Sequence, residues 1–321
     1  MAERPVVFVT RRLPAAVEAR LAERFVPIPN SEDRAWTAEE LVERARRADA
    51  VLTTATERWT AEMLAAVAGR VRILATFSVG TDHIDLEAAR RLGIVVTHTP
   101  DVLTEATADV ALLCLLGAAR RAFEAQRDLR AGVWTRWSPT GYLGLELHGR
   151  TLGIVGMGRI GRAVARRARG FGMTVRYHNR RRLPPELEEG AIWHETLDEL
   201  LPHCAFLSVH CPGTPENRHL LDRRRLALLP RGAVVVNTAR GNVIDEAALL
   251  EALDSGRFFA VGLDVFENEP DVDHRWFTRP RAFLLPHIGS ATVETRDAMG
   301  FRCLESLEAF FAGREPPHRV V

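Results

Sequence analysis

The sequence predicts an α/β protein made of two doubly wound parallel sheets, and three observations lead to this fold class. The chain has 321 residues, about twice the ~150 residues of an average domain, which predicts two domains. Short β-branched runs alternate with amphipathic helical patterns almost from end to end, as in parallel sheets covered by helices. A hydrophobic fraction of 46% and a charged fraction of 26% are ordinary for a globular protein with large cores.

The first of the two doubly wound sheets is expected within about the first hundred residues. Its helical stretches carry apolar residues at the spacing of one buried face, as at Leu41, Ala45 and Ala48. A near-continuous apolar helix is expected over residues 104–122, and the polar stretch 132–149 shows no helical period. The strands expected before this helix are residues 6–10, 50–53, 73–77 and 94–97.

The second doubly wound sheet is expected to begin at Thr151, where strand and helix patterns alternate again. Each expected strand is a short apolar run bounded by polar or glycine-containing turns. They are residues 152–155, 174–177, 206–210, 234–237, 261–264 and 283–285.

Composition excludes several classes of protein. The 43 basic and 42 acidic residues leave a net charge of +1, which provides no field for nucleic acid or an anionic membrane. Every basic residue is Arg and none is Lys, which excludes a Schiff-base lysine and a Walker phosphate loop. The apolar stretch 110–119 is too short to span a bilayer, and the first residues resemble no secretory signal. We therefore expect a cytoplasmic protein that binds neither nucleic acid nor membrane.

The pattern of cysteine and histidine residues predicts neither disulfides nor a metal site. Cys114, Cys204, Cys211 and Cys303 are scattered without a C-x-x-C pair, so they are expected to be reduced thiols. The 11 histidines form no ligand cluster, and we expect no metal.

A glycine-rich loop predicts a dinucleotide site. In TLGIVGMGRIG, Gly156, Gly158 and Gly161 follow an apolar strand and begin a helix. The first glycine allows a tight turn, the second lets backbone N–H groups approach a pyrophosphate, and the third allows close helix packing. A G-x-G-x-x-G match alone is weak, but here the strand and the helix are both in place.

The end of the next strand predicts a preference for NADP, with NAD possible. Asn179 stands where an Asp or Glu would bind the ribose hydroxyls of NAD and repel a 2′-phosphate. Arg180, Arg181 and Arg182 follow it, and guanidinium groups attract phosphate. The missing acid carries more weight than the arginines, because residues 223–225 form another arginine triplet without an assigned role.

Three later strand ends carry candidate chemistry. Arg240 lies in VVVNTARGNVID, Glu269 in GLDVFENEP and His287 in LLPHIGSAT. Ligands of open α/β sheets bind outside the carboxyl ends of the strands, so these segments could converge on one site. Taken singly, each residue also fits an ordinary structural role, as a loop charge, a turn residue and a buried histidine.

Taken together, the motifs resemble a known family. ATFSVGTDHID, TPDVLTEATADVA, GMGRIG, NTARG, LDVFENEP and PHIGSAT occur in the order found in the D-isomer-specific 2-hydroxyacid dehydrogenases. The resemblance covers nearly the whole chain. GVWTRWSPTGYLG and PHIGSAT are most similar to the glyoxylate/hydroxypyruvate reductases within that family.

The resemblance implies a domain arrangement and an assembly. Residues 1–99 and 288–321 would form a flavodoxin-like substrate domain, and residues 100–287 would form a Rossmann NAD(P)-binding domain inserted into it. The apolar helix and the Trp-rich segment after it predict a homodimer, in which Trp137 would reach the substrate site of the partner subunit.

The resemblance also implies the roles of individual residues. Arg240 would bind the carboxylate and keto oxygen of a small 2-oxo acid, His287 would exchange a proton, and Glu269 would hydrogen-bond His287. The backbone N–H groups of Val79 and Gly80 would receive the substrate carboxylate. Asp264 would hold the nicotinamide carboxamide. The expected cofactor-binding set is Thr107, Gly156, Met157, Gly158, Arg159, Ile160, Gly161, Asn179, Arg180, Arg181, Cys211, Pro212, Thr238, Ala239, Asp264 and Gly289.

The expected activity is NAD(P)H-dependent reduction of glyoxylate and hydroxypyruvate to glycolate and D-glycerate, and two alternatives remain open. Residues 53–56 read Thr-Thr-Ala-Thr where the reductases are expected to have bulky aliphatic residues. A smaller, more polar wall would admit a sugar-derived acid such as 2-ketogluconate, unless the segment is a solvated loop. The other alternative is a nucleotide-sensing binding protein that resembles the C-terminal-binding co-repressors.

Overall fold

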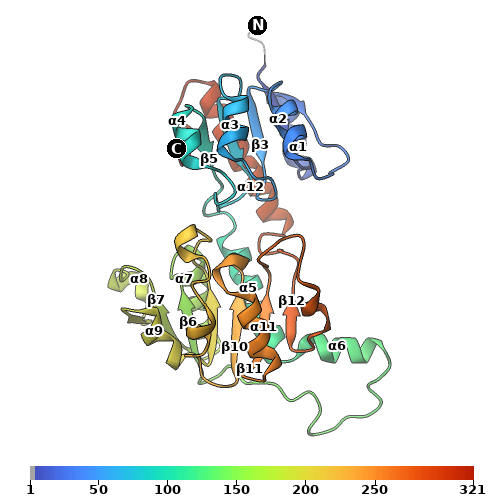
Figure 1. Ribbon diagram of the computed structural model, residues 1–321, viewed down its shortest axis with the longest axis vertical. Helices are drawn as coiled ribbons and strands as arrows, with labels where there is room; N and C mark the ends of the chain where they lie inside the picture. Colours follow the sequence, from blue (N-terminus) through green and yellow to red (C-terminus); the bar gives the residue numbers. More distant parts are fainter. Residues whose placement is uncertain (1–3) are drawn as a thin grey trace. The chain divides into compact units, whose positions relative to one another are not determined.

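The structure is a computed structural model that describes residues 4–321. The chain forms two compact units (Figure 1). Unit 1 combines the chain up to Leu103 with Ser290–Val321, and unit 2 is the continuous segment Thr104–Gly289 inserted between them. The sequence placed the divisions after residues 99 and 287, whereas the units divide after residues 103 and 289. The first division coincides with the start of a helix at Thr104.

Unit 1 contains a parallel sheet with the strand order β2-β1-β3-β4-β5, which is the flavodoxin-like order. Its strands are β1 (Val6–Val9), β2 (Val26–Ile28), β3 (Ala50–Thr53), β4 (Ile73–Thr76) and β5 (Val95–Thr97). Its helices are α1 (Ala15–Arg24), α2 (Ala38–Ala45), α3 (Ala61–Val67), α4 (Leu86–Arg91) and α12 (Val293–Phe311).

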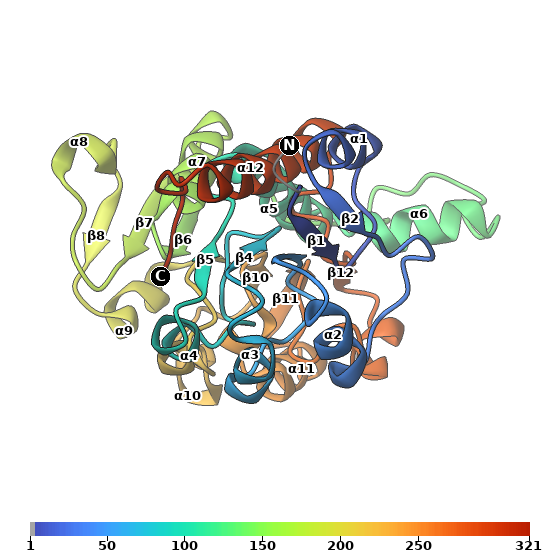
Figure 2. The ribbon, with the colours of Figure 1, turned by 90° about the horizontal axis from the view of Figure 1, so that it is seen from above.

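Helices cover both faces of this sheet because its strands are apolar on both sides. Ala50 and Leu52 of β3 pack in the cluster that includes α1 and α12. Val51, between them, packs in the cluster of α2, α3 and α4. Figure 2 shows the two helix groups on opposite sides of the strands. This alternation is the period-2 pattern of a strand buried on both faces.

Unit 2 contains a parallel sheet with the strand order β12-β11-β10-β9-β6-β7-β8. In chain order within the unit this is the Rossmann arrangement with a further strand at one edge. The strands are β6 (Thr151–Val155), β7 (Thr174–His178), β8 (Ile192–His194), β9 (Phe206–Val209), β10 (Ala233–Asn237), β11 (Phe258–Leu263) and β12 (Ala282–Leu284). The helices are α5 (Thr104–Ala119), α6 (Ala122–Arg130), α7 (Arg159–Gly170), α8 (Pro185–Glu188), α9 (Leu197–Leu200), α10 (Arg223–Leu226) and α11 (Glu246–Asp254).

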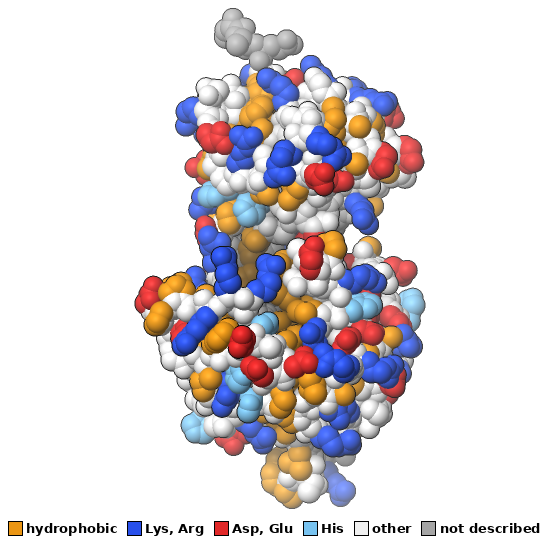
Figure 3. Space-filling view, turned by 60° about the vertical axis from the view of Figure 1, so that its left-hand side comes forward, with side chains coloured by type: hydrophobic (Ala, Val, Ile, Leu, Met, Phe, Trp, Pro, Cys, Tyr) orange, Lys and Arg blue, Asp and Glu red, His pale blue; other side chains and the backbone are white. Residues whose placement is uncertain are grey.

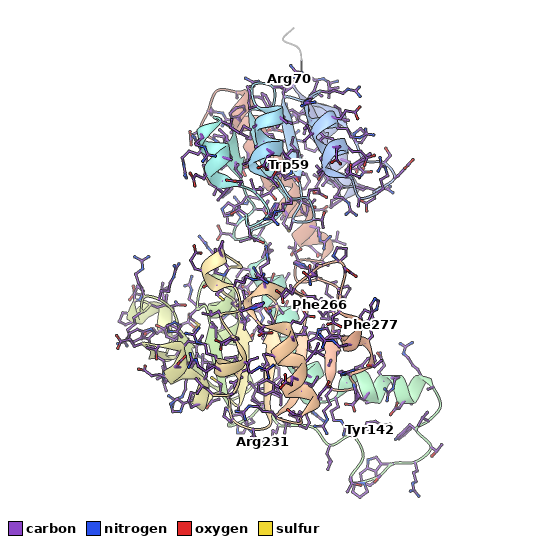
Figure 4. The ribbon with its side chains drawn as sticks, in the orientation of Figure 1. Trp59, Arg70, Tyr142, Arg231, Phe266 and Phe277 are labelled. Carbon is purple, nitrogen blue, oxygen red and sulfur yellow. The ribbon has the colours of Figure 1, made fainter. Side chains whose placement is uncertain are left out.

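Two cores enclose the sheet of unit 2. One contains α5 and α7 packed on apolar residues of β6, β10 and β11. The other contains α9, α10 and α11 on the opposite side chains of the same strands. Because the strands are parallel, all of their carboxyl ends lie on the same side of the sheet. Below, the edge at which the strands end means this boundary, which runs across the strands, and not an outermost strand. Figure 4 shows Phe266, which follows β11, at that edge, and Arg231, which precedes β10, at the other.

The expected fold class is confirmed, and the differences are local. The sequence analysis missed β2 and β8, which are edge strands of three residues each, one of them containing Pro27. Such short edge strands are too brief to show a period. The apolar helix expected over residues 104–122 ends at Ala119, because Arg121 adopts a left-handed conformation with φ 54° before α6 starts.

An arm, defined here as residues 122–144, projects from unit 2. It consists of α6 and the following irregular chain, in which Tyr142 donates a hydrogen bond to Asp128 at 2.9 Å (Figure 4). Its apolar side chains are exposed: Leu129 by 60%, Val133 by 63% and Trp137 by 76%. Residues 132–149 contain no helix or strand in the described chain, as the sequence predicted. Across residues 4–321, each helix is too short or too polar to cross a membrane.

Candidate active site

The candidate site lies along the edge of unit 2 at which its parallel strands end. The strand order changes direction between β6 and β9, and ligands of open α/β sheets bind at such a switch point. Figure 3 shows a group of basic side chains at the upper edge of unit 2. A site for an anionic ligand is therefore favoured at this edge.

The glycine loop has the backbone geometry of a phosphate-binding turn. Gly156 has φ +94°, and a Cβ atom there would lie 2.7 Å from the backbone nitrogen of Cys211. A Cβ atom on Gly161 would lie 2.3 Å from the carbonyl oxygen of Gly156, so α7 can approach the loop only with glycine here. Among the described residues, no side chain caps α7, and its first turn contains no acidic residue. The N–H groups at this helix start therefore favour an anion.

Asn179 is oriented by the glycine loop. Its Oδ1 atom accepts a hydrogen bond from the N–H of Met157 at 2.7 Å. Because the carbonyl oxygen is engaged, the amide nitrogen supplies the remaining polar contact of this side chain, and it is a donor. A donor at the end of β7 suits the oxygens of a ribose phosphate.

The three arginines after Asn179 do not share one role. Arg182 is committed to Glu188, with Nε and Nη2 at 2.8 and 3.0 Å from the two carboxylate oxygens. Tyr177 also donates to Glu188, at 2.7 Å, and accepts from the N–H of Leu183. The hydrogen bonds from Arg182 and Tyr177 lower the pKa of Glu188 to about 2. This leaves Arg180 and Arg181 as the candidates for the cofactor.

Glu269 and His287 form a carboxylate–imidazole pair. Nδ1 of His287 lies 2.6 Å from Oε2 of Glu269, and Oε1 of Glu269 accepts the N–H of Phe266 at 2.7 Å. The His287 side chain is 42% exposed. Because Nδ1 faces the carboxylate, Nε2 is the ring atom left for proton exchange.

Asp264 holds the backbone that carries His287. Its Oδ1 and Oδ2 atoms accept the N–H groups of Ile288 and Gly289, at 2.7 and 2.8 Å. His287 itself has φ 53°, a left-handed conformation that a non-glycine residue adopts only when its surroundings hold it there. Burial raises the pKa of Asp264, and these two backbone donors act against that rise. A contact of Asp264 with a carboxamide remains a proposal.

Arg240 lies on a loop that Asn237 holds. Asn237 ends β10, accepts the N–H of Ala239 at 3.0 Å and donates to the carbonyl of Arg240 at 2.9 Å. Arg240 packs on Gly213, since a Cβ atom there would lie 2.7 Å from its Cγ. The loops after β9 and β10 are thereby joined.

Other expected cofactor residues lie at the same edge. Thr238 Oγ1 is buried and has no hydrogen-bond partner in the described part of the chain. Gly289 adjoins Asp264 and Thr107, with 3.4 Å between the position of a Cβ atom and Cγ2 of Thr107. Cys211 follows β9, and burial raises its pKa to about 11, so it is a neutral thiol. These residues therefore follow several strands at the edge where the strands end.

The expected substrate residues of unit 1 follow β4. The carbonyl oxygens of Val79 and Gly80 accept hydrogen bonds from Nδ1 of His98 at 2.9 Å and Oγ of Ser78 at 2.6 Å. Within residues 4–321, their N–H groups donate to no protein acceptor. Donors of this kind suit a carboxylate.

Sequence reasoning missed two residues that support the site. One is Asn237, whose position at the end of an apolar strand was a usable signal. The other is Glu246 at the start of α11, which accepts the N–H of Glu267 at 2.8 Å and Nε1–H of the buried Trp276 at 2.5 Å. Glu246 thus fixes the segment that leads to Glu269. In the sequence, Glu246 is an ordinary acidic residue in the first turn of a helix. No local pattern indicates its contacts with Glu267 and Trp276.

The residues of unit 2 fit a dinucleotide. The uncapped start of α7, the donor amide of Asn179 and the unpartnered hydroxyl of Thr238 are polar groups directed to no protein partner in the described chain. The described residues contain no group of three or more His, Cys, Asp or Glu that could hold a metal. A Rossmann unit with an imidazole–carboxylate pair at its ligand edge is the arrangement of a nicotinamide-dependent oxidoreductase.

Comparisons with known proteins agree with this class. Residues 112–289 match the family model described as D-isomer specific 2-hydroxyacid dehydrogenase, NAD binding domain. The chain is 43% identical over 321 residues to a glyoxylate reductase of Thermococcus kodakarensis, covering 99% of this chain and 96% of the relative. It is 38% identical over 311 residues to a glycerate dehydrogenase of Hyphomicrobium methylovorum, with 96% and 97% covered.

A solved structure gives the same result. The crystal structure of an NADPH-dependent glyoxylate/hydroxypyruvate reductase from Sinorhizobium meliloti, in complex with NADP and malonate, has a TM-score of 0.88. It is 36% identical, and the match covers 99% of this chain and 97% of that one. The chain belongs to the D-isomer-specific 2-hydroxyacid dehydrogenase family.

Proposed function

We propose that this enzyme reduces glyoxylate and hydroxypyruvate to glycolate and D-glycerate, with NADPH as the preferred cofactor and NAD as a possible one. The observation that carries the proposal is the 2.6 Å contact between Glu269 and His287 at the ligand edge of a Rossmann unit. The named activities of the relatives from Thermococcus kodakarensis and Sinorhizobium meliloti support the choice of substrates.

The chain's own residues account for the chemistry apart from the hydride, which the reduced nicotinamide supplies when bound. His287 donates a proton from Nε2 to the oxygen of the substrate carbonyl as negative charge develops there. Glu269 stabilises the imidazolium that precedes this transfer and keeps the ring in one orientation. Arg240 binds the carboxylate and the carbonyl oxygen, which fixes the face of the carbonyl that is presented. Val79 and Gly80 donate their N–H groups to the carboxylate.

The cofactor preference follows from the groups after β7. Asn179 presents a donor where a carboxylate would repel a 2′-phosphate, and Arg180 and Arg181 add positive charge. The proposed cofactor set is completed by the glycine loop and by Thr107, Arg159, Ile160, Cys211, Pro212, Thr238, Ala239, Asp264 and Gly289.

Initial rates test the proposal directly. Glyoxylate and hydroxypyruvate should be reduced with NADPH, and His287→Ala and Arg240→Ala should each lower kcat/KM by at least ~10²-fold. NADPH affinity, measured by fluorescence titration, should change little in both variants. An enzyme without activity on either acid contradicts the proposal. So does a His287→Ala variant as fast as the parent.

We also infer a cytoplasmic homodimer that pairs through the arm. The exposed Leu129, Val133 and Trp137 are an unusual concentration of apolar surface for one segment. In the proposed dimer, Trp137 approaches the substrate site of the partner subunit.

A further inference from the structure

A buried carboxylate in unit 1 organises the threonine-rich segment that follows β3. Glu57 is 5% exposed, and its Oε2 atom accepts Thr10 Oγ1 at 2.7 Å and the N–H of Thr54 at 2.8 Å. Thr56 Oγ1 lies 2.5 Å from Oε1. Thr53 joins the same group, 3.2 Å from Oε2, and receives Nε1–H of the buried Trp59 (Figure 4).

The hydroxyl protons of this group all point inward. Thr54 Oγ1 lies 2.9 Å from Oε2 of Glu57 and 2.8 Å from Oγ1 of Thr56. A threonine hydroxyl has one proton to donate, and a carboxylate only accepts. The protons of Thr54 and Thr56 are therefore consumed within the cluster. Oγ1 of the half-buried Thr54 also accepts the N–H of Thr56 at 3.3 Å, so the exposed Thr56 is the side chain whose oxygen lone pairs remain for a ligand.

The segment lies beside the loop proposed to bind the substrate carboxylate. β3 and β4 are neighbouring parallel strands, and Thr53 is paired with Thr76 at their carboxyl ends. Residues 54–57 and 77–80 therefore leave the sheet side by side at the edge where ligands of such sheets bind. A 2-oxo acid held by Val79 and Gly80 would have its third carbon within reach of this neighbouring loop.

We propose that Glu57 makes the loop 54–56 a hydrogen-bond acceptor that selects 2-oxo acids bearing a hydroxyl on the carbon next to the carbonyl. The inference rests on the proposed function and specifies its substrate class. A hydroxyl at that carbon donates to Oγ1 of Thr56, whereas a methyl group offers that oxygen no donor. A site built to pair a substrate hydroxyl rejects the analogue that lacks it.

Three substrates separate this proposal from the function on which it rests. Hydroxypyruvate and pyruvate differ by a single hydroxyl, and glyoxylate has no third carbon. We expect the parent enzyme to favour hydroxypyruvate over pyruvate in kcat/KM by ~10-fold, the scale of one hydrogen bond to the substrate hydroxyl. Glyoxylate reduction reports the proposed function without involving this contact.

Thr54→Val and Thr56→Val remove each hydroxyl while preserving side-chain shape. In at least one of them, the ratio of kcat/KM for hydroxypyruvate to that for pyruvate should fall by ~5-fold or more, mainly through KM for hydroxypyruvate. Thr174→Val, an exposed threonine at the amino end of β7, is the matched control and should keep the parent ratio.

Glu57→Gln tests whether the carboxylate of Glu57 orients the hydroxyl protons of Thr54 and Thr56. A glutamine offers one acceptor and one donor, so the hydroxyl protons can no longer all point inward, and the same ratio should fall. The inference is wrong if glyoxylate is reduced but the ratio of kcat/KM for hydroxypyruvate to that for pyruvate stays at the parent value in both threonine variants. In that case the loop does not bind the substrate hydroxyl. If glyoxylate is not reduced by the parent, the proposed function fails instead.

Discussion

The carboxylate of Glu269 is fixed against the imidazole of His287 by a hydrogen bond on its other side. One oxygen lies 2.6 Å from Nδ1 of His287, and the second accepts the N–H of Phe266 at 2.7 Å. The backbone donor leaves the carboxylate little freedom to rotate away. Within the proposed reaction, this arrangement keeps Nδ1 of the ring against the carboxylate and leaves Nε2 as the atom that exchanges a proton with the substrate.

Glu269→Gln should therefore slow keto-acid reduction. Phe266 would orient the amide with its oxygen inward, so the amide nitrogen would face Nδ1 and repel a donor there. The ring is then no longer held with Nε2 presented for proton transfer, and kcat/KM for keto-acid reduction should fall by ~10-fold or more. The measurement is initial rates with saturating cofactor.

Glu267→Gln is the matched control for this experiment. Glu267 is two residues away but binds Arg218 at 2.7 Å and His219 at 2.9 Å. In this variant kcat/KM should stay near the parent value. An equal loss in both variants would show a general charge effect and would contradict the role of Glu269 in holding His287.

Asn179→Asp should reverse the cofactor preference. A carboxylate oxygen can still accept the N–H of Met157, so the glycine loop is retained, while the new charge repels a 2′-phosphate. We expect the ratio of kcat/KM for NADPH to that for NADH to fall by at least ~10-fold. A parent enzyme that already prefers NADH would contradict the assignment of NADP.

The oligomeric state should depend on the arm. Light scattering at micromolar protein should give the mass of a dimer, and the double substitution of Leu129 and Trp137 by Arg should give a monomer, because charge opposes burial. Ile192→Arg is the control, since this exposed residue lies on β8, at the opposite edge of the sheet from β12, which α6 contacts. A parent protein that is monomeric and fully active excludes the proposed role of Trp137.

Glu188 should contribute stability that depends on pH. Its pKa is about 2 in the folded chain against an ordinary value of 4.5, so the contribution is present above pH 4.5 and is lost as the pH falls toward 2. Glu188→Gln should lower Tm by a few degrees at neutral pH, and the difference from the parent should shrink through that window.

The control for this prediction is Glu189→Gln. Glu189 pairs with Arg169 at 3.0 Å, and its side chain is 50% exposed, so its loss should barely change Tm. A Tm difference for Glu188→Gln that is the same at all pH values would mean that the carboxylate charge is not the source of its stability.

The sequence was sufficient for the features that repeat or that lie within one short segment. The alternation of strands and helices predicted both sheets, and the glycine loop with its strand and helix predicted the dinucleotide edge. The hydrogen bond between Glu269 and His287 spans 18 residues and was inferred only through the family resemblance. Spacing alone does not show which strand ends become neighbours.

Contacts made by ordinary residues were beyond the reach of sequence reasoning. No local pattern indicates that both oxygens of Asp264 accept backbone N–H groups after His287. Glu57 attracted no notice, because nothing in its sequence surroundings shows that it is buried beneath four threonines. Such roles depend on which groups are left without water after folding, and that is decided by packing rather than by local pattern.

The ion pair of Arg182 with Glu188 has a consequence for how cofactor choice can change. Together with Tyr177 and the N–H of Leu183, it ties the main chain after β7 to the body of the sheet. These anchors would be the same whichever dinucleotide is bound. If residues 179–181 bind the cofactor as proposed, their side chains can be replaced while these anchors hold the main chain, and the preference can change between NADP and NAD without rebuilding the loop.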